Sequence, residues 1–462
     1  MEGLEVEEGV PSEVLETGGA GTGGEGRRAA KLRRLCLSPS AWYLFKFGGL
    51  ACLMPYIPLL LHSKGLPEHG IGMLLVVRPL LSFLVSPIVC FAADHYGRQK
   101  AALLLSYGFS ILVGASFSLA SSPGSFLLCI IGASLTYGQQ GSLADSAISA
   151  DPNVDYGMMR LWGAVGWGLM NPISGLAQDV LGLWVIFPSH VLISCLALPA
   201  GYWGIDFSFL ARKRTTAPAE PGEALQRPGS KEWKQTQAPS QAPSAWGNLK
   251  RLLAQPEAVA FYGLLLVTGS CTASIESYLF LYLKELGGTT FLAGLTLFFT
   301  CVAEVPMFYF SKNIMARFTV AQLLHLTMLT YTVRLFAYSG LHLMPSAWFV
   351  LPVELLHGVT FGLLFAVGTE YVKNLAPAPS IIATANSLFQ ACHFNLGYAM
   401  GILAGGFVYE RAGGGFLFLA AACWSLFGWV VWGYAQHRLR ARKPDAGDGA
   451  IEDDTVGLLV DD

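Results

Sequence analysis

Residues 90–100 read CFAADHYGRQK, and this short polar stretch separates two long apolar runs, at 70–92 and 101–120. The chain must reverse direction within a few residues here. Gly97 permits backbone angles that residues with a Cβ atom resist, and Asp94 can pair with Arg98 or accept backbone N–H bonds. The cations Arg98 and Lys100 suit the cytosolic side of a membrane, where basic residues accumulate. The stretch therefore predicts a tight cytosolic turn between two membrane-spanning helices.

The rest of the chain repeats the pattern of long apolar runs separated by short connectors. Hydrophobic residues make up 53% of the 462 residues and charged residues only 13%, against about 25% charged in soluble domains. Runs of about 20 apolar residues are long enough to cross a bilayer. We therefore expect an all-α membrane protein with twelve spans, at 40–62, 70–92, 101–120, 124–147, 157–180, 184–205, 256–283, 290–311, 318–340, 345–372, 379–405 and 414–436.

The placement of Lys and Arg predicts the orientation of these spans. With both termini in the cytosol, the basic residues of the outer loops are Lys64, Lys284 and Arg411, and most of the other cations lie in inner segments. This is the positive-inside pattern. Lys46, near the inner end of the first span, is expected to extend toward the membrane surface, whereas Arg78 could extend outward or point into a cavity.

The spans divide into two sets of six. Residues 206–255 between them are rich in Pro, Gln, Ser and Ala and have no apolar periodicity, which indicates a cytosolic linker. The predicted units are a cytosolic tail at 1–39, a six-helix bundle at 40–205, the linker, a second six-helix bundle at 256–436 and a cytosolic tail at 437–462. The last tail carries Leu458 and Leu459 after acidic residues, a pattern that cytosolic adaptors read. It is either an endosomal or lysosomal address or a disordered end.

Residues 90–100 resemble the G-x3-D-x2-G-R-x-[RK] signature of the major facilitator superfamily, with Cys90 in place of the first glycine. The resemblance implies that Asp94, Gly97, Arg98 and Lys100 form a conformational latch on the cytosolic side. Residues 156–168, YGMMRLWGAVGWG, resemble a second signature. It belongs to the branch that holds lactose permease, the nucleoside–proton symporters and the animal facilitator domain-containing protein 6 group.

The second signature points to a solute-binding site in the first half. Arg160 matches an arginine that in lactose permease contacts substrate beside a carboxylate on the fourth helix, and Asp145 is a plausible partner here. The guanidinium group can make several fixed hydrogen bonds to hydroxyls. Gln140, one turn before Asp145, and Trp162, within the signature, are further candidates to line the site. The alternative is an ion pair that only joins two helices.

The second half carries charged side chains within its apolar runs, where each charge is costly. Glu354 and His357 are three residues apart, so they share a helix face. Burial favours the neutral form of a carboxylate, and histidine titrates near neutral pH. Arg334 and Glu304 could join them. We predict a proton-coupling set made of these four residues, or else a fixed polar network that stabilises the bundle.

A polar stripe follows the eleventh run, where Asn386, Gln390 and His393 are spaced by four and three residues. On a regular helix these side chains lie on one face. Hydroxyl or amide groups of a solute would suit such a face, and helix packing would suit it equally well.

These features favour a secondary active transporter that moves a small polar solute by alternating access. Proton-coupled symport of a sugar or nucleoside is preferred, and a membrane receptor or scaffold that lost transport is the alternative. No recognisable catalytic set or ATP-binding loop is present, so we expect neither an enzyme nor a cofactor or metal. The expected partners are the solute, protons, lipid and an adaptor, without nucleic acid. We expect a monomer in the plasma membrane or in an endosomal or lysosomal membrane.

Overall fold

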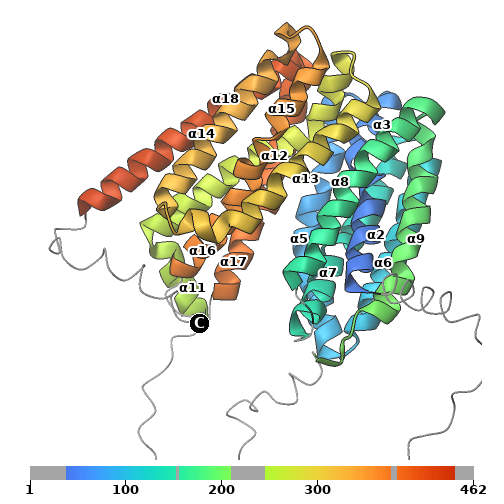
Figure 1. The fold of residues 1–462 in the computed structure, drawn as a ribbon, viewed down its shortest axis with the longest axis horizontal. Coiled ribbons are helices and arrows are strands. Elements are labelled where there is room, and N and C mark those ends of the chain that lie inside the picture. Colours follow the sequence, from blue (N-terminus) through green and yellow to red (C-terminus); the bar gives the residue numbers. More distant parts are fainter. Residues whose placement is uncertain (1–37, 152–153, 155, 210–244, 376–381, 443–462) are drawn as a thin grey trace, which may run out of the picture.

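A computed structural model describes residues 38–151, 154, 156–209, 245–375 and 382–442 of the chain. Within these ranges the ordered elements are helices, and Figure 1 shows them in two groups that stand side by side. Most of the predicted linker and both tails, with Leu458 and Leu459, lie outside the described residues.

The first group runs from the N-terminal side to the linker. Its helices are α2 (Pro39–Ala51), α3 (Ile57–Ser63), α4 (Glu68–Leu75), α5 (Val77–His95), α6 (Gln99–Ser116), α7 (Pro123–Ala150), α8 (Tyr156–Leu181) and α9 (Ile186–Gly204). The predicted first span is interrupted by a short 3-10 turn, Met54–Tyr56 (η1). Pro55 and Pro58 explain the interruption, because proline lacks the N–H that a continuous helix requires.

The second group follows the linker. Its helices are α11 (Ala245–Ala254), α12 (Pro256–Glu285), α13 (Thr290–Met315), α14 (Val320–Ser339), α15 (Val350–Glu354), α16 (Leu364–Leu375), α17 (Ile382–Gln390) and α18 (Tyr398–Arg442). Two π-helical segments lie among them, η6 (Gly358–Leu363) and η8 (Ala391–Gly397). Gly413 divides α18 with a φ of 81°, which separates the last two predicted spans.

Eight described segments are long and apolar enough to cross a membrane, and the one at Ala385–Leu439 covers the last predicted span and most of the one before it. The predicted runs at 124–147, 157–180 and 318–340 are helices of sufficient length, α7, α8 and α14, but are more polar. The chain is therefore an all-helical integral membrane protein. The count of twelve spans and the cytosolic termini stay predictions.

The turn at residues 96–98 forms as expected. Gly97 has a φ of +63°, its N–H donates to the Asp94 carbonyl at 3.1 Å, and the Arg98 N–H donates to the Ala93 carbonyl at 2.9 Å. These two bonds are the pair that ends a helix in a Schellman motif. The Asp94 carboxylate accepts a hydrogen bond from the Gln99 side chain at 3.1 Å, and the Lys100 ammonium lies 4.3 Å from the Tyr202 ring centre. The turn thus places all four predicted latch residues at one end of the first group.

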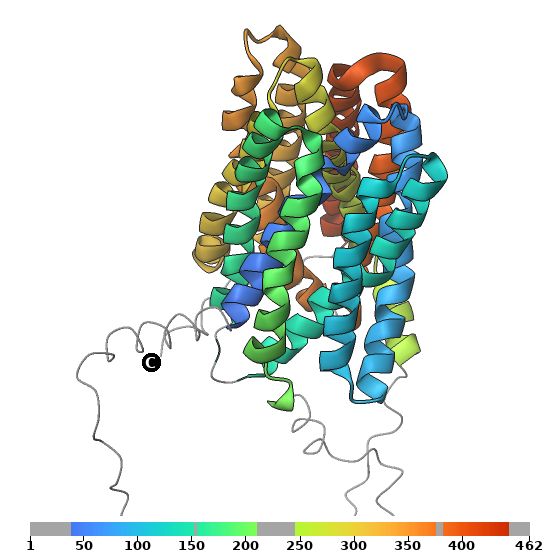
Figure 2. The same ribbon diagram turned by 90° about the vertical axis from the view of Figure 1, so that its right-hand side faces the viewer.

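The two groups approach each other most closely at the end opposite α11, and in Figure 1 they separate toward the α11 end. Figure 2, turned by 90°, shows the blue-to-green first group in front of the second. Helix α8 packs against α13, and α4 packs against α18. We call the α11 end the linker end and the opposite end the far end. The latch turn lies at the linker end.

Two carboxylates join the groups at the far end. Asp179 of α8 accepts hydrogen bonds from the N–H groups of Thr290 and Phe291, which begin α13. Glu410 of α18 accepts from the N–H and from the ring of His69, in the first turn of α4. The first N–H groups of a helix have no partner within the helix and favour a negative charge. Each group therefore caps one helix of the other.

Candidate functional site

A buried ion pair forms the centre of a polar network in the second group. Arg334 of α14 donates from Nη2 to Glu354 Oε2 at 2.7 Å, and the two side chains are only 3% and 2% exposed. Tyr338, one turn after Arg334, accepts from Arg334 Nε and donates to Glu354 Oε1, both at 2.8 Å. Removing one member would leave an uncompensated buried charge. The pair is therefore a fixed structural centre.

The same guanidinium extends to the edge of the network. Arg334 Nη1 donates to His357 Nδ1 and to Thr360 Oγ1, each at 3.0 Å. An arginine can only donate, so Nδ1 accepts and the ring proton of a neutral His357 is on Nε2. His357 can gain a second proton only if its bond from Arg334 breaks.

Glu304 of α13 lies beyond His357. Its Oε2 is 3.9 Å from His357 Nε2, too far for a hydrogen bond, and the two side chains are 20% and 14% exposed. Glu304 lies on α13, the helix that packs against α8 of the first group. The structure thus brings the four predicted proton-coupling residues together, with Glu304 on the helix that contacts the other group.

A second cluster, in the first group, contains the predicted ion pair. Arg160 Nη1 donates to Asp145 Oδ2 at 2.8 Å, and the Tyr43 hydroxyl donates to Asp145 Oδ1 at 2.5 Å. The guanidinium carbon lies 5.5 Å from the Phe47 ring centre. Arg160 remains 46% exposed. The ion pair therefore leaves a large part of the guanidinium uncovered.

Lys46 belongs to this cluster, and the expectation that it extends to the membrane surface is wrong. The residue is 4% exposed, and its ammonium lies 5.1 Å from the centre of the Phe47 ring, which Arg160 also contacts. Helix α2 packs against both α8 and α9, which encloses the side chain. The cluster therefore holds two cations and one carboxylate.

Gln140 and Trp162 do not join this cluster. Gln140 is buried and donates to the Ser106 carbonyl of α6 at 3.2 Å, inside the first group. Trp162 is 40% exposed and lies two residues from Arg160, and helical residues two apart do not share a face. The structure therefore does not bring Gln140 to Arg160, and a contact of Trp162 with the solute stays a prediction.

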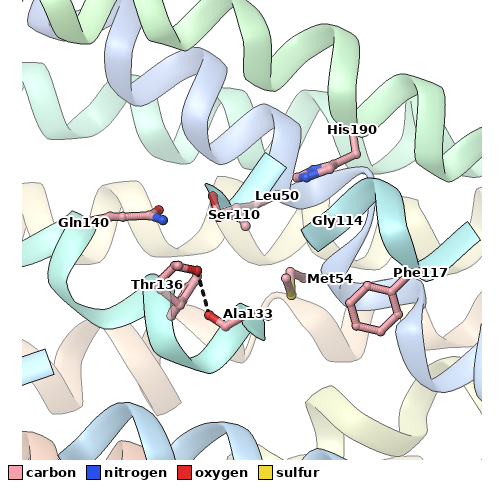
Figure 3. A pocket seen from close by; sticks show the side chains of 10 residues that line it. Leu50, Met54, Ser110, Gly114, Phe117, Ala133, Thr136, Gln140 and His190 are labelled. Atoms are coloured by element: carbon pink, nitrogen blue, oxygen red, sulfur yellow. Dashed lines mark hydrogen bonds between the residues drawn. The ribbon is translucent and has the colours of Figure 1, made fainter. Parts of the chain in front are cut away.

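Gln140 instead lines a small cavity within the first group, shown in Figure 3 with Thr136, Met54 and His190. The cavity volume is about 20 Å³, which is room for one water molecule. His190 binds the Gly49 carbonyl through Nδ1 at 2.8 Å. A sugar or a nucleoside does not fit in this cavity, so it is not the solute site.

The predicted stripe of Asn386, Gln390 and His393 is divided. Gln390 is exposed and Asn386 is half-buried, whereas His393 is fully buried with its Nδ1 3.1 Å from the Thr268 hydroxyl of α12. The cause is η8, because a π-helix bonds five residues apart and breaks the 3.6-residue repeat. His393 is therefore a packing residue, and the stripe is not one continuous face.

Sequence reasoning missed several residues that complete these clusters, namely Tyr43, Tyr338 and Thr360. A signal was available for Tyr338, which follows Arg334 by four residues, and for Thr360, which follows His357 by three. Tyr43 contacts Asp145 from 102 residues away. A local pattern cannot reveal such a contact.

Comparisons with known proteins agree with this arrangement. The model of the MFS_1 like family matches residues 36–420. The maltose permease of Geobacillus stearothermophilus is 25% identical over 395 residues, covering 84% of this chain and 92% of the permease. A human major facilitator superfamily domain-containing protein 6-like protein is 24% identical over 177 residues, which is 38% of this chain and 29% of that protein.

Solved structures show the same fold. The crystal structure of the nucleoside transporter NupG superimposes with a TM-score of 0.68 at 13% identity, covering 87% of this chain and 98% of NupG. The sequence comparison and the fold comparison thus agree on the same kind of protein. The chain belongs to the MFS_1 like family, and it is a membrane transporter of the major facilitator superfamily rather than an enzyme.

Proposed function

We propose that this protein is a secondary active transporter that carries a small polar solute, of the sugar or nucleoside class, by alternating access with proton coupling. One observation carries the proposal: helix α8, which holds Arg160, packs against helix α13, which holds Glu304, so the two charged clusters lie on helices that meet where the groups face each other. A solute that enters the space between the groups contacts a cation cluster on one side and a titratable carboxylate on the other.

The contacts between the groups support alternating access. The reciprocal caps at Asp179 and Glu410 hold the far end closed, while the first group's charge cluster contains an arginine that is 46% exposed. With the linker end in the cytosol, as the basic residues predict, this is an inward-facing state. Transport then requires that the caps break and that the linker end closes, with the latch turn at Asp94, Gly97, Arg98 and Lys100 among the closing contacts.

In the proton-coupling part of the proposal, Glu304 takes up and releases the proton, while His357 keeps its own Nε2 proton on the side of Glu304. Glu304 has the most exposed side chain of the four. Arg334 and Glu354 neutralise each other and hold His357 in place. Protonation of Glu304 removes a negative charge from the space between the groups. Such a change biases the two states if one of them stabilises that charge better.

The proposal extends to the cellular setting. We place the protein as a monomer in the plasma membrane or in an endosomal or lysosomal membrane. The tail with Leu458 and Leu459 serves there as an adaptor-binding address. Alanine at both positions is expected to move the protein between these membranes, as fluorescence microscopy of a tagged chain would show. An unchanged distribution of the protein between membranes would contradict the proposed role of Leu458 and Leu459 as an adaptor-binding address.

The test of transport is uptake by vesicles that contain the purified full-length chain, with and without an inward proton gradient. A panel of sugars and nucleosides is offered, and accumulation above equilibrium is expected only with the gradient. Accumulation without any gradient would contradict the proposed proton coupling. The same panel separates transport from the receptor alternative, since a receptor would bind a solute without moving it.

A further inference from the structure

The helix α12 carries one side chain that its surroundings do not cover. Every residue from 267 to 283 is buried except Glu276, which is exposed. Helix α12 is packed against α18, η8, α3 and α13, so this exposed position does not lie on an open side of the bundle. A carboxylate is costly on a lipid-facing surface. Glu276 therefore opens onto the space between the two groups.

Contacts with the first group locate Glu276 in that space. Its Oε1 accepts a hydrogen bond from the Tyr398 hydroxyl at 2.9 Å. Tyr398 packs in a cluster with Leu75 and Val76 of the first group. Arg78 follows Leu75 by three residues, so the two side chains lie on the same side of this helical stretch. This favours the second of the two predicted orientations of Arg78, toward the space between the groups.

Arg78 keeps donors free for a ligand. Its Nη1 lies 3.4 Å from the Met54 sulfur, and the guanidinium carbon is 5.6 Å from the Tyr137 ring centre. Both contacts are weak compared with an ion pair. A carboxylate from one group and a guanidinium from the other therefore face a common space, each with unused hydrogen-bonding capacity.

A row of aromatic rings connects this carboxylate to the proton-coupling residues. Phe361 stacks on His357 with ring centres 5.1 Å apart and planes 11° apart. Phe394 follows at 6.2 Å from Phe361, and Tyr398 follows at 5.5 Å from Phe394. Phe361 and Phe394 are partly exposed. The row offers flat apolar surface to a planar ring.

Resting on the proposed transport function, we propose that Glu276, Arg78 and the aromatic row from Phe361 to Tyr398 form the solute site, and that its solute is a ribonucleoside. The base stacks on the rings, since stacking on aromatic side chains tolerates any base. The vicinal hydroxyls of the ribose donate to the free oxygen positions of the Glu276 carboxylate, and Arg78 donates to oxygens of the solute. A sugar lacks the planar ring, and a free base lacks the diol.

The test is binding to the purified full-length protein, with uridine, 2′,3′-dideoxyuridine and ribose as probes. Uridine is expected to bind about tenfold or more tightly than dideoxyuridine, because hydrogen bonds to a charged group are the strong ones. Glu276→Gln should weaken the binding of uridine and leave the binding of dideoxyuridine unchanged, so that the ratio of the two affinities falls to about one. Phe394→Ala should weaken both nucleosides by the same factor. Glu257→Gln, the same change in the first turn of α12, is the control and should bind as the unaltered chain does.

Thermal unfolding of each variant checks that it is folded, and Glu276→Asp gives a second variant that keeps the charge and should keep discrimination against dideoxyuridine. The inference is overturned if uridine does not bind, if Glu276→Gln retains the discrimination, or if ribose binds as tightly as uridine. Vesicles that accumulate another solute while uridine fails to bind would overturn this site alone. Uridine binding with the expected ratio, but without uptake of any solute, would overturn the transport function and support the site.

Discussion

Asp179 caps α13 of the opposite helix group, with its Oδ1 2.8 Å from the Thr290 nitrogen. The Lys284 ammonium lies 3.9 Å from the same oxygen. Glu410 repeats the arrangement in the reverse direction, at the start of α4. Both capped helices begin the second predicted span of their group, and the two carboxylates lie at the end of, or just beyond, the fifth predicted span. The far end is thus closed by two equivalent contacts.

The first prediction concerns this closure. Asp179→Asn combined with Glu410→Gln should shift the population toward states open at the far end, about tenfold or more. Each removed negative charge stabilises a helix start by about 0.3–1 kcal/mol. The contribution is larger where the carboxylate also accepts hydrogen bonds. Distances between spin labels at Ser63 and Ser346 report the opening. Asp206→Asn, beyond the end of α9, is the control. Unchanged distance distributions would show that the caps do not hold the closed state.

The buried pair gives a stability prediction. Glu354→Ala should lower the free energy of unfolding by about 3–5 kcal/mol, because it leaves Arg334 charged and unpaired in the interior. Replacing both residues with leucine should recover part of this loss. Thermal unfolding in detergent measures both variants. Equal stability of Glu354→Ala and the unaltered chain would mean that the pair is not the structural centre of the network.

Glu304 gives the prediction on proton coupling. Glu304→Gln imitates the protonated carboxylate permanently, so accumulation driven by a proton gradient should disappear while exchange of solute across the membrane continues. Vesicle uptake and counterflow measure the two activities. Glu370→Gln, at an exposed position of α16, serves as the matched control. Gradient-driven accumulation by Glu304→Gln would place the proton on another residue.

Arg160 gives the prediction on solute contact in the first group. Arg160→Ala should reduce uptake about tenfold or more. The Arg160 side chain is 46% exposed, so its guanidinium can donate hydrogen bonds to a solute, and a water molecule in its place would not reproduce their fixed geometry. Arg160→Lys should restore only part of the activity, since lysine keeps the charge and loses the planar fork. Arg251→Ala, at an exposed position of α11, controls for loss of a cation. Full uptake by Arg160→Ala would reduce this cluster to an ion pair between helices.

The turn at Gly97 gives a prediction that isolates backbone strain. A Cβ on Gly97 or on Gly108 would meet no atom within 4 Å, yet only Gly97 has a positive φ. Gly97→Ala should therefore destabilise the protein by about 1–2 kcal/mol. Gly108→Ala, inside α6, should stabilise it by about 0.5–1 kcal/mol. Thermal unfolding of the two variants measures the difference, and equal effects would contradict the strain argument.

Much of the fold follows from local patterns in the sequence. Gly97 predicts the turn between α5 and α6, and the three-residue spacing of Glu354 and His357 predicts that they share a helix face, from which both contact Arg334. The ion pair between Asp145 and Arg160 was also predicted. In each case the relevant geometry is set by a few neighbouring residues or by a motif.

The failures have equally specific causes. The spacing of Asn386, Gln390 and His393 predicts one face of a regular helix, for solute or for packing, whereas His393 lies in the π-helical segment η8 and is buried in the bundle. Lys46 is expected near water because it lies close to the end of a predicted span. Its actual depth depends on how α8 and α9 cover α2, and the local sequence does not contain that packing. Asp179 contacts Thr290 across 111 residues and across two groups. Such a contact depends on the conformational state of the whole molecule, which no local pattern contains.

The hydroxyl side chains of α12 have a consequence for biosynthesis. Thr268, Ser270, Thr272 and Ser274 each donate to a carbonyl of their own helix three or four residues earlier. These groups are satisfied before any neighbour arrives. The nascent segment can therefore partition into the bilayer as an independent helix and acquire its neighbours later, in a separate assembly step.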